Sequence, residues 1–307
     1  MIQKNRLGNS ALEVSQIGLG CMSLGTNEHN ARDIVKRALE LGVNYFDTAD
    51  LYDLGENEKI VGNALRGQRD NVILATKAGN RWIPGQDGWE WDPSKKHIHS
   101  AIKDSLHRLK TDYIDLYQLH GGTIEDPTDE TIDAFEELKK EGLIREYGIS
   151  SIRPNVIKRF IENSSIISVM MQFSMLDNRP EEWLELFQTH NVGIIARGPL
   201  AKGLLSDEWN EKLKTKYAGK GYMDYSDKDL SEILPKLKDI IGDRSLEAAA
   251  FHYCLSQPSV AAVIPGASSI EQLEANVRAI QKYEFSIGEM KQLQGLLKQT
   301  VYKEHRQ

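Results

Sequence analysis

The sequence predicts an α/β protein in which eight parallel strands close into a (β/α)8 barrel, the TIM-barrel fold. Eight short apolar segments typical of buried strands alternate with segments whose apolar residues recur at helical spacing. Most of the loops between them are short, so the strands should run parallel with right-handed crossovers. Eight such units within roughly 250 residues fit a closed barrel better than an open, doubly wound sheet.

Four strand and helix pairs are expected in the first half of the chain. Strands are expected at residues 16–20, 43–47, 72–76 and 114–119, and helices at residues 31–41, 56–65, 93–109 and 129–141. Gly42 and Gly142 mark helix ends, because glycine readily adopts the left-handed conformation that closes a helix. Pro93, between Asp92 and Ser94, is a helix-entry signal.

Four further pairs complete the predicted barrel. Strands are expected at residues 144–149, 167–172, 192–196 and 260–264, and helices at residues 154–162, 180–190, 245–255 and 270–281. We expect residues 1–15 to form a small β-hairpin that plugs the barrel floor, and residues 288–307 to form a C-terminal helix or tail. We interpret the whole chain, residues 1–307, as one domain.

Residues 206–231 interrupt the alternation. The segment is polar, rich in lysine and aspartate, and contains two glycines near a group of tyrosines. These features are typical of a long loop, here above the seventh strand. A disordered insertion is one interpretation; we favour a mobile flap that closes over a ligand.

The composition limits the classes of partner. The chain has 307 residues, of which 40% are hydrophobic and 27% charged, enough for a sizeable core. The formal net charge is −7, and no long Lys/Arg block occurs, so nucleic acid is not expected as the main partner. A small-molecule ligand is expected instead, bound by a monomer or a weak oligomer.

Neither a membrane nor an oxidising compartment is indicated. No apolar run approaches the roughly 20 residues of a membrane-spanning helix, and the amino-terminal residues lack the core of a secretory signal. Cys21 and Cys254 have no CxxC partner, so we expect reduced cysteines. His97 and His99 have no third ligand nearby and are expected at the surface. We therefore expect a cytoplasmic protein without a metal site.

Polar side chains end three successive predicted strands, at Asp47, Lys77 and His120. Side chains alternate along a strand, so each shares a side with the residues two and four positions before it. This register predicts that all three face the barrel interior, whereas Asp50 lies off it and is interpreted as loop structure. The active site of such a barrel forms at the carboxyl ends of its strands.

Together with Tyr52, these groups could exchange a proton with a substrate oxygen. A lysine at a barrel rim needs a counter-charge, which Asp47 would supply. A neighbouring ammonium favours the phenolate form of tyrosine and so suits Tyr52 to proton transfer. His120 would donate a hydrogen bond to the same oxygen. Each residue alone also fits an ordinary structural role; the four together favour a site.

Seven stretches in order carry a family resemblance: RLGNSALEVSQIGLGCMSLG, GVNYFDTADLYDLGENE, LATKAG, DYIDLYQLHG, GLIREYGISS, GPLAKGLLS and VIPGASSIEQLEAN. On these stretches the chain resembles the aldo-keto reductase superfamily along nearly its whole length. The resemblance implies hydride transfer between NADPH and a carbonyl carbon, without a metal. It implies Tyr52 as the general acid, Asp47 and Lys77 as the pair that tunes it, and His120 as the group that orients the carbonyl.

The resemblance also implies cofactor-binding residues. Those at the nicotinamide end are Gly20, Cys21, Met22, Asp47, Ser150, Ser151, Gln172 and Arg197. Those toward the pyrophosphate and adenosine are Gly198, Pro199, Leu200, Gly266, Ala267, Ser268, Gln272 and Asn276. NADPH is the expected cofactor, with NADH as the alternative.

Three places depart from the family pattern. Ser151 stands where asparagine is common. Arg197 stands where many relatives stack an aromatic ring on the nicotinamide; a guanidinium can also stack, but it would repel the cationic oxidised ring. This predicts a bias toward reduced cofactor. Ser268 and Ser269 stand where relatives often offer a lysine or arginine to the 2′-phosphate, which keeps NADH open as the alternative.

Three other interpretations compete. A Rossmann protein would explain the glycines at 18 and 20, but its fingerprint needs glycine where Ser23 stands and leaves Lys77 and His120 unexplained. A Schiff-base aldolase would use Lys77 as a nucleophile. A nucleotide-binding regulatory module, similar to the cation-channel β-subunits of the same fold, would bind without turnover. The complete set of four polar residues favours an enzyme.

The position of a substrate pocket is predicted from aromatic and apolar residues. Met22, Trp82, Trp89 and Trp91 could wall an apolar site beside Tyr52, and the three tryptophans belong to the loop after the third strand. Simple anchoring of that loop is the alternative role. The expected substrate is a small-molecule carbonyl compound.

Overall fold

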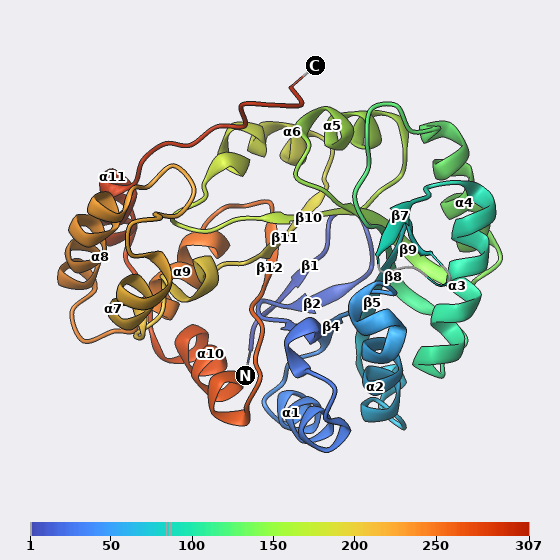
Figure 1. The fold of residues 1–307 in the computed structure, drawn as a ribbon, viewed down its shortest axis with the longest axis horizontal. Helices are drawn as coiled ribbons and strands as arrows, with labels where there is room; N and C mark the ends of the chain where they lie inside the picture. Colours follow the sequence, from blue (N-terminus) through green and yellow to red (C-terminus); the bar gives the residue numbers. More distant parts are fainter. Residues whose placement is uncertain (1, 84, 86–87, 307) are drawn as a thin grey trace.

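Eight parallel strands form a barrel in the computed structural model of this protein, which describes residues 2–83, 85 and 88–306. The strand order is β12-β11-β10-β9-β8-β5-β4-β3, so consecutive barrel strands are neighbours in space. Parallel bridges from Ile17 to Val263 and from Gly20 to Gly266 close the ring. Helices surround it, as Figure 1 shows. The predicted fold class is confirmed.

Three predicted segments extend beyond the described residues. Met1 belongs to the predicted hairpin and Gln307 to the predicted C-terminal segment. Pro84, Gln86 and Asp87 belong to the tryptophan-rich loop. These five residues lie outside the described ranges.

Each predicted strand and helix overlaps an observed one. The barrel strands are β3 Leu19–Gly20, β4 Tyr45–Asp47, β5 Ile73–Ala78, β8 Ile114–Leu119, β9 Ile144–Ser150, β10 Ser168–Gln172, β11 Gly193–Arg197 and β12 Val260–Ile264. The corresponding helices are α1 Glu28–Glu40, α2 Glu56–Ala64, α3 Lys95–Leu109, α4 Thr128–Lys140, α5 Pro154–Asn163, α6 Leu184–Thr189, α9 Leu246–Leu255 and α10 Ile270–Lys282. None of the helices in the described ranges combines the length and apolar character needed to cross a membrane.

Polar caps fix where several helices begin above the strand ends. Asn27, Ser94 and Ser269 each accept a hydrogen bond from the backbone N–H three residues later, at the starts of α1, α3 and α10. Such a cap contributes about 1 kcal/mol, because it satisfies a donor that the first helical turn leaves free. Pro154 begins α5, as predicted, since its missing N–H is not needed there.

The predicted hairpin closes the barrel floor. Strands β1 Lys4–Arg6 and β2 Glu13–Ser15 pair antiparallel. Leu7 and Leu12 of the connecting turn and Val14 of β2 pack into the barrel interior. Gly8 permits this close approach: its φ is 53°, and a Cβ there would lie 2.1 Å from a backbone carbonyl oxygen of the barrel.

Two apolar layers build the core. The inner one fills the barrel and includes Tyr45, Ala75 and Leu116, which the strand alternation predicted to face inward. The outer one lies between the strands and the surrounding helices. Each strand is therefore buried on both faces, which is why its sequence is a nearly continuous apolar run.

The interval of residues 206–231 contains more regular structure than the predicted loop. It holds the short helix α7 Trp209–Lys212, a π-helical turn at Leu213–Tyr217, and the beginning of helix α8 Asp227–Ile241. The long-loop prediction is therefore wrong for much of this segment.

Helix α8 was missed although its sequence carries clear signals. Ser226 and Asp229 form a reciprocal cap at its start, and Leu230, Leu234 and Leu237 are buried at helical spacing. Pro235 stands within this pattern and normally argues against a helix interior. Here the packed apolar face outweighs the cost of the proline.

The C-terminal segment is a helix followed by a tail, as predicted. After α11 Ile287–Leu296 the chain crosses to the neighbourhood of α5, visible as the dark red segment in Figure 1. Asn178 Nδ2 donates to the Lys298 carbonyl at 3.0 Å, and Asn178 Oδ1 accepts from the Thr300 N–H at 2.9 Å. The His305 carbonyl accepts from the Asn155 N–H at 2.8 Å. The tail is therefore fastened along its length.

Candidate active site

Neighbouring strands bring polar side chains together at their carboxyl ends. Asp47 of β4 lies in register with Ala75 of β5, and Lys77 of β5 lies in register with Gln118 of β8. Asp47, Lys77 and Gln118 are all buried. Lys77 and Gln118 both donate to Asp47, and the residues two positions earlier in the three strands belong to the barrel interior, so the predicted inward register of these strands is confirmed.

Lys77 is the centre of a buried hydrogen-bond network. Its Nζ lies 2.5 Å from Asp47 Oδ1, 2.7 Å from the Thr48 carbonyl oxygen and 3.4 Å from Tyr52 Oη. Gln118 Nε2 donates to the other Asp47 oxygen at 3.3 Å. Burial alone would lower the pKa of Lys77, but Asp47 and Tyr52 outweigh it and raise that pKa. Lys77 therefore remains an ammonium that points one donor at Tyr52.

Tyr52 is placed by an unusual turn. It begins the 3₁₀ turn Tyr52–Gly55, in which Asp53 and Leu54 both have positive φ, 49° and 57°. Such conformations cost non-glycine residues of order 1 kcal/mol or more and cluster at functional sites. The Tyr52 ring stands edge-on to His120, with 6.0 Å between ring centroids.

A second set of contacts holds the loop between β4 and this turn. Thr48 Oγ1 donates to Asn57 Oδ1 at 2.7 Å, and Asn57 Nδ2 donates to the Cys21 carbonyl at 2.9 Å. Both Thr48 and Asn57 are fully buried. The loop that carries Tyr52 is thus tied to the end of the first barrel strand.

His120 follows β8 and presents a neutral imidazole. Its backbone N–H donates to the Ala78 carbonyl at 2.7 Å, and its carbonyl accepts from Asn80 Nδ2 at 3.3 Å. Burial, with the nearby charges of Lys77 and Arg197, lowers the pKa of His120 to about 3. Among the described residues, no group hydrogen-bonds its Nδ1.

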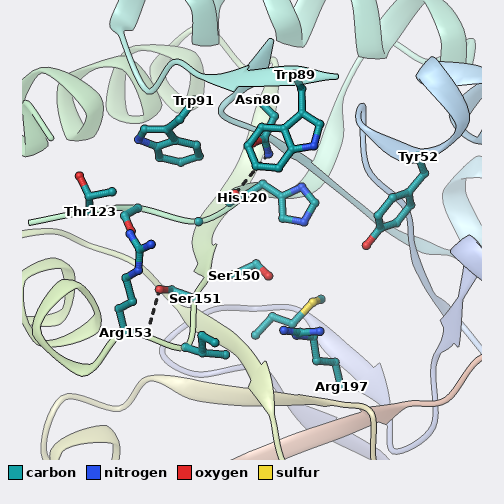
Figure 2. A pocket seen from close by; sticks show the side chains of 14 residues that line it. Tyr52, Asn80, Trp89, Trp91, His120, Thr123, Ser150, Ser151, Arg153 and Arg197 are labelled. Atoms are coloured by element: carbon teal, nitrogen blue, oxygen red, sulfur yellow. Dashed lines mark hydrogen bonds between the residues drawn. The ribbon is translucent and has the colours of Figure 1, made fainter. Parts of the chain in front are cut away.

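A cavity of about 420 Å³ opens beside Tyr52 and His120 (Figure 2). Trp89 and Trp91, from the hairpin of β6 Asn80–Trp82 and β7 Trp89–Trp91, line it as predicted. Trp91 also anchors its loop, because its Nε1 donates to Asp126 Oδ1 at 2.8 Å. We call this space the substrate-side cavity.

Two residues predicted for this cavity lie elsewhere. Trp82 pairs with Trp89 across the β6–β7 hairpin and is absent from the cavity lining. Met22 is 64% exposed and belongs to a neighbouring cavity. The hairpin was not predicted, and it brings Asn80, Trp89 and Trp91 rather than Trp82 to the cavity lining.

The neighbouring cavity, of about 310 Å³, is called the cofactor-side cavity. It shares Tyr52, Met170 and Arg197 with the substrate-side cavity. The predicted cofactor residues that line it are Gly20, Met22, Asp47, Gln172, Arg197, Gly198 and Gly266. Ser150 and Ser151 line the substrate-side cavity instead.

The remaining predicted cofactor residues do not line either cavity. They are Cys21, Pro199, Leu200, Ala267, Ser268, Gln272 and Asn276. Cys21 is fully buried, and its thiol faces the Leu19 carbonyl oxygen at 3.5 Å. Gln272 and Asn276 support the loop after β12: Gln272 accepts from the Ser268 N–H at 3.0 Å, and Asn276 donates to the Gly266 carbonyl at 3.2 Å.

Several cavity-lining residues were not found from the sequence. They are Ser23, Asn80, Thr123, Arg153, Met170, Lys202 and Tyr222. Met170 stands two residues before Gln172 in β10, so alternation could have found it. Arg153 and Thr123 belong to loops, whose path no periodicity predicts, and Asn80 belongs to the unpredicted strand β6.

Asp50 and the paired histidines complete the predicted polar residues. Asp50 belongs to the loop after β4, as interpreted, but it is buried, and burial with nearby Glu58 raises its pKa to about 8. His97 and His99 are partly exposed, and His99 lies 3.2 Å from Glu137. Within the described ranges, no group of three or more His, Cys, Asp or Glu residues is placed to hold a metal ion.

Comparisons with known proteins agree with this geometry. The model of the aldo/keto reductase family matches residues 16–298. The uncharacterized oxidoreductase YqkF of Bacillus subtilis is 54% identical, over 99% of this chain and 100% of its own. L-galactose dehydrogenase of Arabidopsis thaliana is 30% identical, over 92% and 89%. The holo form of aldo-keto reductase AKR11C1 from Bacillus halodurans superposes with a TM-score of 0.95, at 54% identity over all of both chains.

Proposed function

The chain belongs to the aldo/keto reductase family, and on this premise we propose that it reduces aldehydes and ketones to alcohols with NADPH as hydride donor. The chief support is Tyr52, which lines both cavities and lies 3.4 Å from Lys77. A carbonyl group held where the cavities meet would contact the phenol hydroxyl and face the cofactor-side cavity. The proposed substrate is a small-molecule carbonyl compound.

Tyr52 is the proposed general acid. Its hydroxyl proton passes to the carbonyl oxygen while the carbonyl carbon receives the hydride, so a neutral alcohol forms and Tyr52 is left as phenolate. Lys77 stabilises that negative charge, and Asp47 holds Lys77 in position from 2.5 Å. The phenolate recovers its proton from solvent before the next turnover.

His120 is the proposed orienting group. With its pKa lowered to about 3, the imidazole is neutral around neutral pH. A neutral ring donates a hydrogen bond to the carbonyl oxygen without adding a charge beside Lys77 and Arg197. The ionisation of His120 should therefore not appear in the pH–rate profile around neutrality.

The residues of the cofactor-side cavity fit a dinucleotide. Gly20, Gly198 and Gly266 bring backbone to the cavity lining, and Lys202 supplies positive charge for a phosphate. The charge of Asp47 is already balanced by Lys77. From the family resemblance, Ser150, Ser151 and Gln172 would hold the carboxamide. Ser268, in place of a cation, keeps NADH as the alternative nucleotide.

Residues 206–231 are proposed to close over the bound nucleotide. Tyr222 of this segment lines the cofactor-side cavity, and its hydroxyl accepts a hydrogen bond from Gln172 Nε2 at 3.2 Å. Limited proteolysis with and without NADPH tests the closure. Protection of this segment supports it, and unchanged cleavage contradicts it.

Of the two alternatives, an aldolase and a regulatory module, the aldolase fits the site less well. A Schiff-base aldolase needs a neutral amine at Lys77, whereas its pKa is raised and its ammonium is bonded to Asp47 and Thr48. Borohydride trapping of a carbonyl compound on Lys77 would support the aldolase. A regulatory module would bind nucleotide without any reaction.

The absorbance of NADPH, followed with a panel of aldehydes, ketones and dicarbonyl compounds, tests the proposed reaction. Oxidation with at least one of them supports the reductase. Tight NADPH binding in a fluorescence titration, with no turnover of any compound, would point to the regulatory module instead.

A further inference from the structure

The charged side chains that line the substrate-side cavity are all positive among the described residues. Its charged lining residues are Arg153 and Arg197, and no aspartate or glutamate is among the described residues that line it. Arg197 also lines the cofactor-side cavity, whereas Arg153 belongs to the substrate side. Figure 2 shows Tyr52 and Arg153 on opposite sides of the cavity, with His120 between them. Arg153 is thus placed to meet the part of a substrate remote from its carbonyl.

Arg153 lacks a carboxylate partner in the part of the chain that the structure describes. Its Nη1 donates to the Gly122 carbonyl at 2.5 Å, and its backbone N–H donates to Ser151 Oγ at 3.2 Å. Among the described residues, no carboxylate lies within 4.0 Å of its guanidinium. Two other half-buried arginines differ: Arg108 is 2.7 Å from Glu58, and Arg179 is 2.6 Å from Asp177.

Asp126, which contacts two residues of the cavity wall, is already hydrogen-bonded on both oxygens. Asp126 accepts hydrogen bonds from Trp91 Nε1 at 2.8 Å and from both the N–H and the hydroxyl of Thr123, at 2.6 and 2.7 Å. It therefore fixes the wall rather than neutralising Arg153. A guanidinium with one carbonyl partner keeps several N–H donors for a ligand, in a planar fork that matches carboxylate and phosphate oxygens.

We propose that Arg153 binds an anionic group of the substrate, a carboxylate or a phosphate, at the end opposite to the reacting carbonyl. The substrates are then carbonyl acids or carbonyl phosphates with an apolar or aromatic spacer. Trp91 and Met170 in the cavity lining offer apolar contacts to that spacer. The proposal rests on the proposed function, because the position of the carbonyl comes from Tyr52.

The test uses rigid probes that differ in one group. The NADPH-loaded protein is assayed with 4-formylbenzoate, 4-formylphenyl phosphate and the neutral methyl 4-formylbenzoate. The variants are Arg153→Gln, Arg153→Lys and, as a matched control, Arg159→Gln. Arg159 lies on α5, the helix that Arg153 precedes, and like Arg153 it donates to a backbone carbonyl, that of Ile124 at 2.9 Å, but it does not line the cavity.

The expected result is a preference for one or both anions that depends on Arg153. Arg153→Gln should lower kcat/KM for the preferred anion about 10- to 100-fold, mainly through KM, and leave the methyl ester nearly unchanged. Arg153→Lys should keep part of the preference, and Arg159→Gln all of it. The relative loss of kcat/KM for 4-formylbenzoate and 4-formylphenyl phosphate identifies which anion the site binds.

Two outcomes would overturn the proposal: no preference of the native protein for either anion over the ester, or an equal loss for all three compounds in Arg153→Gln. If none of the compounds is reduced, the proposed function fails, and calorimetric titration with the same three compounds still decides the anion site. If an anionic compound binds more tightly than the ester and Arg153→Gln abolishes that difference, the anion site is supported. Equal binding of the acid and the ester contradicts it.

Discussion

The two ends of one barrel differ in what they bury. At the floor, Leu7 and Val14 of the hairpin pack against apolar side chains of the strands. At the carboxyl ends of the strands, the buried groups are Asp47, Lys77 and Gln118. A buried ion pair contributes little to stability after its desolvation cost, whereas an apolar layer contributes directly. The comparison indicates that stability is concentrated at the floor and chemistry at the opposite end.

Removal of the Tyr52 hydroxyl should have the largest effect, on activity and not on stability. We expect Tyr52→Phe to lower kcat by about 10²- to 10⁴-fold, because the phenol hydroxyl is the proposed proton donor to the substrate oxygen. NADPH binding and the free energy of unfolding should change little, since Tyr52 is only half-buried and lies on the rim. Steady-state kinetics, a fluorescence titration and urea denaturation measure the three quantities.

A loss of nucleotide binding or of stability in parallel with activity would assign Tyr52 a structural role instead. Leu54→Ala serves as the control within the same turn, because the Leu54 side chain is 69% exposed. It should leave activity and stability close to those of the native protein.

Truncation at the floor should have the opposite effect. Leu7 is fully buried in the barrel interior, so Leu7→Ala should reduce the free energy of unfolding by about 2–5 kcal/mol. The folded fraction should retain its kcat, because Leu7 is at the other end of the barrel from Tyr52. Urea denaturation followed by tryptophan fluorescence gives the first value; a large fall in kcat of the folded protein would break the proposed separation.

Asp50, at the polar end of the barrel, should make the free energy of unfolding depend on pH. Its pKa is raised from the usual 3.8 to about 8, so its ionised form is disfavoured in the folded protein. The unfolded chain loses this proton near pH 4, and stability should fall as pH rises from about 4 to about 8. Asp50→Asn should remove this component and stabilise the protein at pH 8, on the order of 1–3 kcal/mol.

Thermal melting at several pH values, on the native protein and on Asp50→Asn, measures this component. The gain in melting temperature should be larger at pH 8 than at pH 5. An equal gain at both pH values would mean that Asp50 does not titrate in this range.

Arg197→Phe should produce the smallest change. On the proposed placement of the nicotinamide, the guanidinium would repel the cationic oxidised ring, so its replacement by an aromatic ring should strengthen binding of NADP⁺ relative to NADPH. A two- to fivefold shift in the ratio of the two dissociation constants corresponds to about 0.5–1 kcal/mol. Calorimetric titration with each nucleotide measures it; an unchanged ratio would remove Arg197 as the source of any bias.

The sequence predicted the barrel better than the cavities, for a physical reason. Strand alternation fixes which side chains face the interior, so Asp47, Lys77 and Gln118 could be placed before their distances were known. The path of a loop has no such period. Trp82 was therefore misplaced, and Arg153 was not found at all.

Helix α8 shows a second limit of sequence reasoning. Its apolar face and its Ser226 cap are both readable, but the polar residues, the two glycines and the tyrosines of residues 206–231 suggested a long loop. Tertiary packing decides whether a proline inside a helical pattern is tolerated. Local signals alone do not contain that packing.

Transfer of deuterium from NADPH labelled at the nicotinamide C4 position is the most direct test of the proposed chemistry at the polar end. The native protein, mixed with an aldehyde that it turns over and with NADPH labelled on the reacting face, should yield an alcohol with one deuterium at the carbinol carbon. Tyr52→Phe should bind the same nucleotide and form little labelled alcohol. Tight NADPH binding by the native protein, with every aldehyde recovered unlabelled and unreduced, would contradict the proposed function.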